Sequence, residues 1–413
     1  MVPILRADFN DRFSDASYAQ LLTSLEKRTR TRLKLRVAET PVFLPEDLVG
    51  EMVRAGEVMT QQLLSDGEYL KRAAATIPQA YFVAGQDAHP NFMTADFGLV
   101  RDPDGLLTPR LVELQAFPSV YGYQAVLAEE YQRCFDLHPA LQTTLGLSDT
   151  QYWQALREVI VGDHDPANVA LLEVDPANQK TLPDFHVHED RLGISTVDIT
   201  KVRARGSRLE YLRDGVWTPI HRIYNRAIAD EMMRRSVTPG FDLHAEYDVE
   251  WAGHPNWYFL ISKFALPFLR HPSVPGAVFL DAWMRGEKRD VLPEDRSQLI
   301  LKPLFSFAGK GIVFAPTDEL LRSIPEPERA GYLLQQRVEF DRNVLTPHGP
   351  TQAEVRILYV WPQGGKLTAV NTLVRLGRGQ MMGVDHNRDQ AWVGGSAGLL
   401  APKLSQKGND GGL

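Results

Sequence analysis

The sequence predicts an α+β fold that begins with a helical segment. Three patterns carry this prediction. Apolar residues recur at helical spacing through residues 15–76, and from residue 91 the pattern changes to short β runs separated by turn signals. Residues 168–199 alternate strand, helix and strand, which is typical of a parallel sheet. A chain of 413 residues is long enough for two or three domains.

The composition excludes several classes of protein. Hydrophobic residues make up 44% and charged residues 23%, which is ordinary for a globular protein. A net charge of −7 gives no electrostatic footprint for nucleic acid. No run of about 18 apolar residues predicts a membrane span. The charged first residues, Met1 to Arg12, lack an apolar signal core, so we expect a cytoplasmic protein.

Two local features of the sequence give little information about function. The single cysteine, Cys134, excludes an internal disulfide and reads as a small apolar residue of a helix at 122–134. The basic run Lys27–Arg36 reads as a solvated helix face or a subunit contact, which leaves a homodimer open.

Three helices are predicted before residue 80. The first spans Asp15–Lys34 with Ser14 or Asp15 as its N-cap, and the second spans Pro45–Leu64 with Pro45 in its first turn. A third runs from Gly67 to Thr76, where Pro78 stops it.

A hairpin follows, with strands at 94–100 and 110–117 around an Asp-Pro-Asp-Gly turn. Pairing centred on the turn places Asp96 opposite Glu113, with Gln115 on the same face. Two carboxylates and an amide oxygen suit Mg²⁺ or Mn²⁺. The alternative is the polar outer face of an ordinary hairpin, and a bulge would shift the register.

The strand-helix-strand unit comprises 168–174, 181–192 and 194–199, and ligands of such units sit at the carboxyl ends of the strands. A small hairpin at 209–217 precedes the strand 221–226. Arg222 and Arg226 share one face of that strand. They could bind an acid group of a substrate through bidentate hydrogen bonds, or pair with Asp230 and Glu231.

The most informative stretch is 299–356. An apolar run carries Lys302, the small-residue loop 306–311 follows, and a second apolar run spans 312–314. Two strands joined by a glycine loop expose backbone N–H groups to anionic oxygens, and the lysine adds a reachable charge, so we expect bound phosphate. Gln335-Gln336 and the strand carrying Glu354 and Arg356 complete the series.

The C-terminal part is rich in glycine and cations at 372–379, 383–387 and 392–398. Such loops cradle phosphate or an acid, or form a turn-rich β-meander. The glycine-rich tail 401–413 is expected to fray.

Taken together, Asp96, Glu113-Leu114-Gln115, Lys263, Lys302 with its loop, Gln335-Gln336, and Arg375 with Asn387 resemble the permuted ATP-grasp family. The similarity is to the branch that contains glutathionylspermidine synthetase and uncharacterised bacterial relatives, and it spans residues 91–400. In that branch the metal ligands precede the ATP-binding lysines, as they do here. The resemblance implies an ATP-grasp-like fold in permuted order and an ATP-dependent carboxylate-amine ligase that forms an amide through an acyl phosphate.

The resemblance also implies roles for individual residues. The metal ligands would be Asp96, Glu113 and Gln115, holding Mg²⁺ or Mn²⁺. Lys302 and Arg375 would be catalytic. ATP would contact Lys263, Lys302, Ser306, Gly309, Lys310, Gly311, Gln335, Gln336, Val338 and Arg375. The carboxylate and amine substrates would meet Arg222, Arg226, Asn387 and Ser396.

The sequence departs from the family pattern near the metal hairpin. Gln115 replaces an asparagine, Phe117-Pro118-Ser119 replaces Asp-Thr-Pro, and Thr94 replaces an arginine. These changes bear on the second metal ion and on the substrate. The chain also has no length for the cysteine amidase domain of the bifunctional relatives, so glutathionylspermidine is not the expected product.

The predicted organisation has six parts. These are a helical segment (1–90), the metal hairpin and helix (91–165), an α/β substrate domain (166–255), an ATP lid (256–345), core return strands (346–400) and the tail (401–413). Two alternatives to a ligase are a catalytically silent nucleotide-binding protein and a phosphotransferase that forms no amide.

Overall fold

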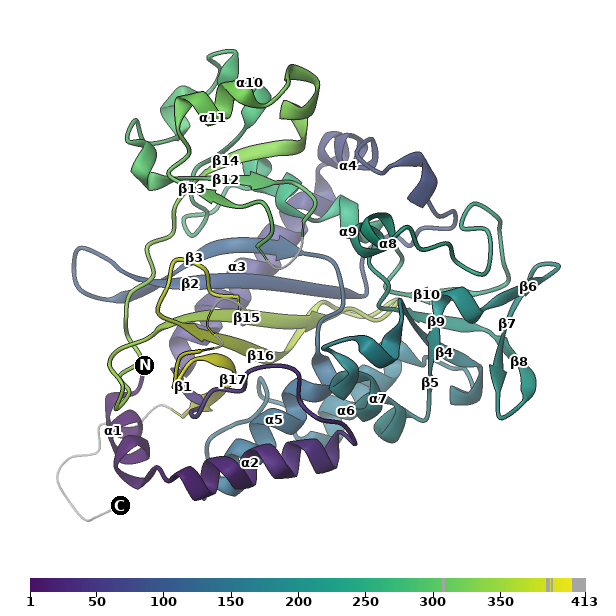
Figure 1. The fold of residues 1–413 in the computed structure, drawn as a ribbon, viewed down its shortest axis with the longest axis horizontal. Coiled ribbons are helices and arrows are strands. Elements are labelled where there is room, and N and C mark those ends of the chain that lie inside the picture. Colours follow the sequence, from purple (N-terminus) through teal and green to yellow (C-terminus); the bar gives the residue numbers. More distant parts are fainter. Residues whose placement is uncertain (307–308, 384–386, 388, 403–413) are drawn as a thin grey trace.

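The computed structural model describes residues 1–306, 309–383, 387 and 389–402 (Figure 1). It has an α+β fold, as predicted, with four sheets. Phe307, Ala308, residues 384–386 and all but the first two residues of the predicted frayed tail lie outside the described ranges. Within those ranges, no helix has the length and apolar character needed to cross a bilayer.

The N-terminal segment forms helices and one strand. Ser14 caps α2 as predicted, because its hydroxyl accepts from the amide of Ser17. The helix ends at Arg28 instead of Lys34, since Arg30 has a positive φ of 53° that a helix does not continue. The bounds are α1 Pro3–Arg12, α2 Asp15–Arg28, β1 Val42–Pro45, α3 Glu46–Ser65 and α4 Gly67–Ala74.

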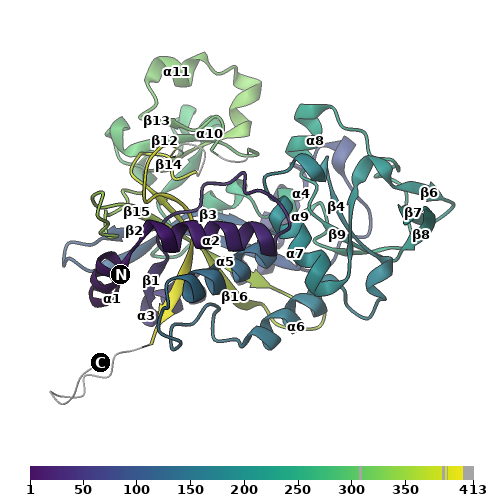
Figure 2. The ribbon, with the colours of Figure 1, turned by 60° about the horizontal axis from the view of Figure 1, so that its bottom comes forward.

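A six-stranded core sheet forms the centre of the molecule, in the order β1-β17-β16-β15-β2-β3. β1 pairs parallel with β17, so the segment expected to be helical also contributes a strand to the core. Apolar side chains of α3 pack on one face of the sheet. The helices α2 and α5 lie on the other (Figure 2). The remaining bounds are β2 Phe92–Arg101, β3 Leu107–Gln115, α5 Tyr121–Cys134, β15 Gln352–Val360, β16 Thr368–Gly377 and β17 Gly394–Ala401.

The register of β2 and β3 places Asp96 directly opposite Glu113, as predicted. Near the turn the pairing is offset by one residue, with Phe97 opposite Leu111. A bulge between these positions restores the expected alignment. Because a one-residue slip moves every side chain to the opposite face, this bulge decides which residues face the site.

The α/β unit contains the predicted parallel sheet, ordered β10-β9-β4-β5, with α7 as the crossover. Thr181 precedes α7 as expected, but its side chain makes no capping hydrogen bond. The predicted hairpin turns at Asp214-Gly215. The bounds are α6 Asp149–Ile160, β4 Val169–Glu173, α7 Leu182–Leu192, β5 Ser195–Asp198, β6 Arg203–Arg205, β7 Arg208–Arg213, β8 Val216–Ile220, β9 Arg222–Asn225, α8 Ala229–Arg235 and β10 Glu250–Ala252.

We call residues 256–345 the lid. Its antiparallel sheet, β11-β14-β12-β13, lies above β2 and β3 in Figure 1. The predicted hairpin around the glycine loop is present, with Ile300 opposite Phe314. The bounds are α9 Trp257–Leu260, β11 Ala277–Phe279, α10 Leu280–Met284, β12 Leu299–Pro303, β13 Val313–Phe314, α11 Asp318–Ser323 and β14 Tyr332–Gln336.

Gly98 of β2 is where the end of the lid rests on the core sheet. A Cβ at this position would lie 2.7 Å from Val338 and 2.8 Å from Phe340. The amide of Asp341 donates to the carbonyl of Leu99 at 2.8 Å. Only a residue without a side chain allows this approach, so Gly98 sets the height of the lid above the core.

We expect Gly98→Ala to lower the free energy of unfolding by about 1–3 kcal/mol, because overpacking displaces Val338 and Phe340. Chemical denaturation measures the change. Gly67→Ala is the matched control, since a Cβ there meets nothing within 4 Å. Equal stability of both variants would contradict the proposed contact.

Candidate functional site

The site is built on two rows of charged side chains that cross the core sheet. Glu113, Asp96 and Arg356 lie opposite one another on β3, β2 and β15. Glu354 and Arg375 form a second row on β15 and β16. Because residues two apart on a strand share a face, both rows point to the same side of the sheet.

Asp96 is the centre of a buried ion network. Arg356 donates to both carboxylate oxygens, at 2.5 and 2.7 Å, and Arg375 donates to one at 2.5 Å. Arg375 also pairs with Glu354. Burial alone would raise the pKa of Asp96, but the two guanidinium groups outweigh it and hold the pKa below its ordinary value. Asp96 therefore stays ionised at neutral pH.

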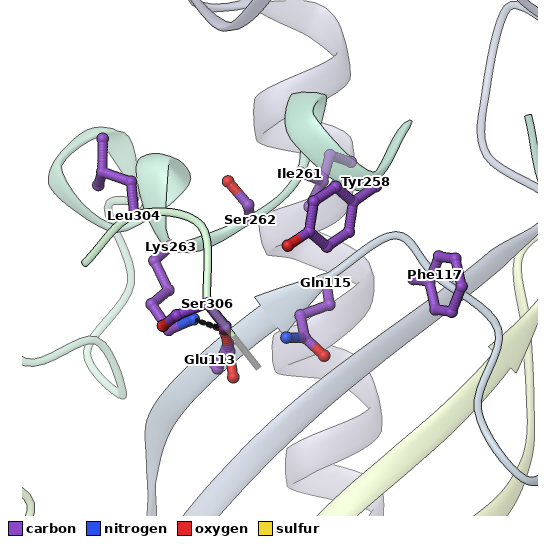
Figure 3. Close-up of a pocket in the computed structure, with 9 residues that line it drawn as sticks. All are labelled: Glu113, Gln115, Phe117, Tyr258, Ile261, Ser262, Lys263, Leu304 and Ser306. Atoms are coloured by element: carbon purple, nitrogen blue, oxygen red, sulfur yellow. Dashed lines mark hydrogen bonds and ion pairs between the residues drawn. The ribbon is translucent and has the colours of Figure 1, made fainter. Parts of the chain in front are cut away.

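Lys263 links the lid to the core. Its ammonium group lies 2.9 Å from Oε1 of Glu113 and donates to the carbonyl of Ser306 at 2.7 Å (Figure 3). Only 5% of Lys263 is exposed. Its charge is therefore shared between a carboxylate of the core hairpin and the start of the glycine loop.

Lys302 points from β12 toward the core sheet and is only 4% exposed. Its ammonium group donates to the carbonyl of Val112 at 3.2 Å, and no carboxylate of the described residues lies within ion-pair distance. Burial lowers the pKa of Lys302 to about 8, while Glu113 acts in the opposite direction. A buried ammonium group without a carboxylate in contact favours an anionic ligand.

Glu113, Lys263 and Ser306 meet at a small pocket between lid and core (Figure 3). The pocket is lined by Glu113, Gln115, Phe117, Tyr258, Ile261, Ser262, Lys263, Leu304 and Ser306. The hydroxyl of Ser306 has no hydrogen-bond partner among the described residues. The buried side-chain amide nitrogen of Gln335, on β14, also has no hydrogen-bond partner among the described residues. Gln335 and Lys302 share a face of the lid sheet by strand alternation, so unsatisfied donors and a cation gather on one surface.

The second part of the glycine loop, from Gly309 onward, lies against the chain that follows β16. Gly309 and Gly311 have φ values of 71° and 73°, a region that favours glycine. A Cβ on Gly309 would lie 2.1 Å from Met381, so the loop packs closely on the chain after β16. Lys310 is exposed. Gln336 is the last residue of β14, and Val338 lies in the irregular segment after it that packs on Gly98. Free donors, cations and glycines together favour an anionic ligand.

The predicted metal ligands do not form a free ligand set. Asp96 and Glu113 are neighbours as expected, but Asp96 faces two arginines and Glu113 faces Lys263. Gln115 lines the pocket beside Glu113. Among the described residues, no group of three His, Cys, Asp or Glu side chains is arranged to hold a metal. The role of Mg²⁺ or Mn²⁺ stays a prediction, and no step below depends on it.

The predicted substrate arginines are engaged within the α/β unit. Arg222 pairs with Glu250 and donates to the carbonyls of Val159 and Ile160 at 3.1 Å. Arg226 pairs with buried Asp184. Neither partner is Asp230 or Glu231, which the sequence had suggested as the alternative. Both arginines support the fold in this arrangement, and neither lines the pocket below the lid.

Asn387 and Ser396 also serve local structure. Asn387 donates to the carbonyls of Met381 and Gly383 at 3.0 and 3.2 Å, which braces the chain after β16. Ser396 is fully buried, and its hydroxyl donates to the carbonyl of Thr40 at 2.6 Å. Their contact with a substrate stays a prediction.

Sequence reasoning assigned no role to Arg356, Glu354, Tyr258 or Ser262. Alternation along the run 354–356 was the available signal, since it places Glu354 and Arg356 on one face of a strand. Tyr258 and Ser262 gave no signal, because the lid brings them to the pocket from a connection without a motif.

The structure is thus an α+β fold in which a small lid sheet faces a core sheet across lysines and carboxylates. Among solved structures the chain is similar to a glutathione synthetase-like effector from Globodera pallida, solved in the apo form. The TM-score is 0.59 over 95% of this chain and 99% of the other, at 12% sequence identity. That similarity shows the fold. No protein-family model matches the sequence, and no curated protein matches it.

We expect Asp96→Asn to destabilise the protein at pH 7 by about 3–5 kcal/mol, because it leaves two buried guanidinium groups without their counter-charge. The stabilisation is present above the unfolded pKa of about 4 and is lost as the pH falls through the lower folded value. The difference in the free energy of unfolding between wild type and variant should therefore become smaller at acidic pH. Urea denaturation at several pH values measures it, with exposed Asp104→Asn as control. A difference independent of pH would contradict the assignment.

Proposed function

We propose that this protein is an ATP-dependent carboxylate-amine ligase. The observation that carries the proposal is the position of Lys302, a buried cation without a contacting carboxylate among the described residues, directly above the charged rows of the core sheet. Nucleotide phosphates would supply the missing counter-charge. The glutathione synthetase-like fold of the structural neighbour, named as an effector, supports the same class of chemistry.

The residues fit a reaction in two steps. A carboxylate oxygen attacks the γ-phosphorus of ATP, the bond from that phosphorus to the β-bridging oxygen breaks, and ADP leaves. The lone pair of an amine nitrogen then attacks the acyl carbon, the carbon–oxygen bond to phosphate breaks, and the nitrogen loses a proton. Lys263 and Lys302 would neutralise the phosphates, and Arg375 would stabilise the acyl phosphate.

Binding of ATP must enlarge the pocket between the lid and the core. Its volume is about 10 Å³, room for a single water molecule. The ion pair between Lys263 and Glu113 holds the lid against the core, and the hydrogen bond from Lys263 to the carbonyl of Ser306 fixes the start of the glycine loop to the same lysine. A phosphate that takes Lys263 from Glu113 would loosen this tether and free a carboxylate at the same time.

One observation favours a second candidate, a nucleotide-binding protein without ligase turnover. Both oxygens of Asp96 are occupied by Arg356 and Arg375. A carboxylate saturated by two guanidinium groups is a poor metal ligand until one of them leaves. Such a protein would bind ATP and release no ADP.

We expect Lys302→Met to abolish binding of a non-hydrolysable ATP analogue. The same change should raise the free energy of unfolding at pH 7 by about 1–3 kcal/mol, because it removes a buried charge and keeps the apolar stem. Calorimetric titration and chemical denaturation measure the two effects. Exposed Lys71→Met is the control. Unchanged nucleotide affinity would remove Lys302 from the ATP site.

ADP release separates the three functions. A ligase should release ADP only when a carboxylic acid and an amine are both present, in a coupled assay over a panel of each with Mg²⁺. A phosphotransferase would release ADP without the amine. Analogue binding without ADP release under any combination would favour the silent protein, and no analogue binding would contradict the nucleotide site itself.

A further inference from the structure

A second cavity lies beside the charged rows, on the same face of the core sheet. Its volume is about 120 Å³. One wall is the β15–β16 part of the sheet, with Arg356, Leu373 and Arg375, and another is the start of α5. An apolar cavity of about 150 Å³ holds benzene, so this space suits roughly five or six non-hydrogen atoms.

Residues 35–37 form the roof of this cavity. The carbonyl of Arg36 accepts from the amide of Gly395 at 2.8 Å, and the amide of Ala38 donates to the carbonyl of Gly395 at 2.8 Å. These bonds fix the segment to β17, so the roof is part of the folded core. Leu35, Val37, Val120, Leu127 and Leu373 give the cavity apolar walls.

Two of the polar residues that line this cavity carry unsatisfied donors. Tyr123 is 5% exposed, and its hydroxyl has no hydrogen-bond partner among the described residues. The Nε–H of Arg375 is also buried and unpaired within those residues. Burial raises the pKa of Tyr123, so its hydroxyl stays protonated and can donate. A buried donor without a partner costs free energy that an acceptor on a ligand recovers.

The two unpaired donors favour an acid as the ligand. Arg356 and Arg375 are paired with Asp96 and Glu354, and Arg36 at the roof is paired with Glu39. The hydroxyl of Tyr123 and the Nε–H of Arg375 can still donate to a carboxylate, and a donor on a charged guanidinium group binds a carboxylate more strongly than a neutral amide.

The cavity and the lid pocket lie along one row of the core sheet. Glu113 lines the lid pocket, Arg356 lines this cavity, and Asp96 lies between them on the middle strand. Neighbouring strands are about 4.8 Å apart, so the two pockets are separated by roughly 10 Å along one row. For phosphoryl transfer the γ-phosphate would have to extend along this row to within about 3 Å of the acid.

We propose that this cavity binds the acid substrate of the ligase and that the acid carries a small branched apolar group. The carboxylate would accept from Tyr123 and from Nε of Arg375, and the apolar group would fill the space below Leu35. The assignment of the bound acid as a substrate rests on the proposed function. Tyr123 and the roof residues would then determine specificity.

The test is a ligand-observed NMR titration of the full chain with 2-methylpropanoate, compared with the neutral 2-methylpropanamide. Wild type should bind the carboxylate at least tenfold more tightly than the amide. Tyr123→Phe should weaken carboxylate binding about tenfold, as expected for a lost hydrogen bond to a charged group. Because the hydroxyl has no hydrogen-bond partner in the described part of the chain, this variant should fold as well as wild type.

Leu35→Trp should fill the cavity from its roof and abolish binding of both probes. Lys34→Trp is the matched control, because Lys34 is exposed on the same segment and absent from the cavity lining. Both variants should keep the affinity of wild type for the ATP analogue. Equal carboxylate binding by wild type, Tyr123→Phe and Leu35→Trp would overturn the proposal, as would no binding by wild type at millimolar probe.

The outcomes separate this inference from the proposed function. Carboxylate binding that depends on Tyr123 and Leu35, in a protein that binds no ATP analogue, would support the acid pocket and contradict the ligase. Analogue binding with an acid affinity insensitive to both variants would support the nucleotide site and place the acid elsewhere.

Discussion

Asp96 is buried on the second strand from the edge of the core sheet, and it stays ionised because Arg356 and Arg375 surround it. Asp96 lies on β2, which is distant in sequence from β15 and β16, so the network forms only when these three strands pair in the observed register. A slip of one residue would leave buried charges unpaired, at a cost comparable to the whole stability of a domain. The order and register of the core strands therefore depend on this interaction.

The lid is held over this network by an apolar contact at one end and by charged side chains at the other. Val338 packs on Gly98, which fixes one end of the lid by close apolar contact. Lys263 joins the other side through Glu113, and Lys302 adds a cation that the described residues do not fully balance. The apolar contacts of the lid are therefore complete, whereas the charge of Lys302 has no contacting carboxylate among the described residues. This is the arrangement expected of a site that exchanges some of its own stability for the ability to bind an anion.

The hairpin of β2 and β3 was predicted correctly from local patterns. A Pro-Asp-Gly turn and alternating side chains place Asp96 opposite Glu113, and the bulge that restores this register had no sequence signal. The cap at Ser14 and the lysine hairpin of the lid were predicted for similar local reasons. The contribution of β1 to the core was missed, because a four-residue strand next to a long helix gives no periodicity of its own.

The sequence by itself determined the fold class, the helix and strand periods, and the residue types that carry charge at the candidate site. Those properties depend on residues close together in the chain, where spacing and side-chain chemistry can be read directly. Only the tertiary structure decided the partners of each charge. It directed Arg222 and Arg226 into the α/β unit, turned Asp96 toward Arg356, and placed Leu35 over the same sheet face. Such partners are set by strand pairing and desolvation across the whole chain, and a linear pattern contains neither.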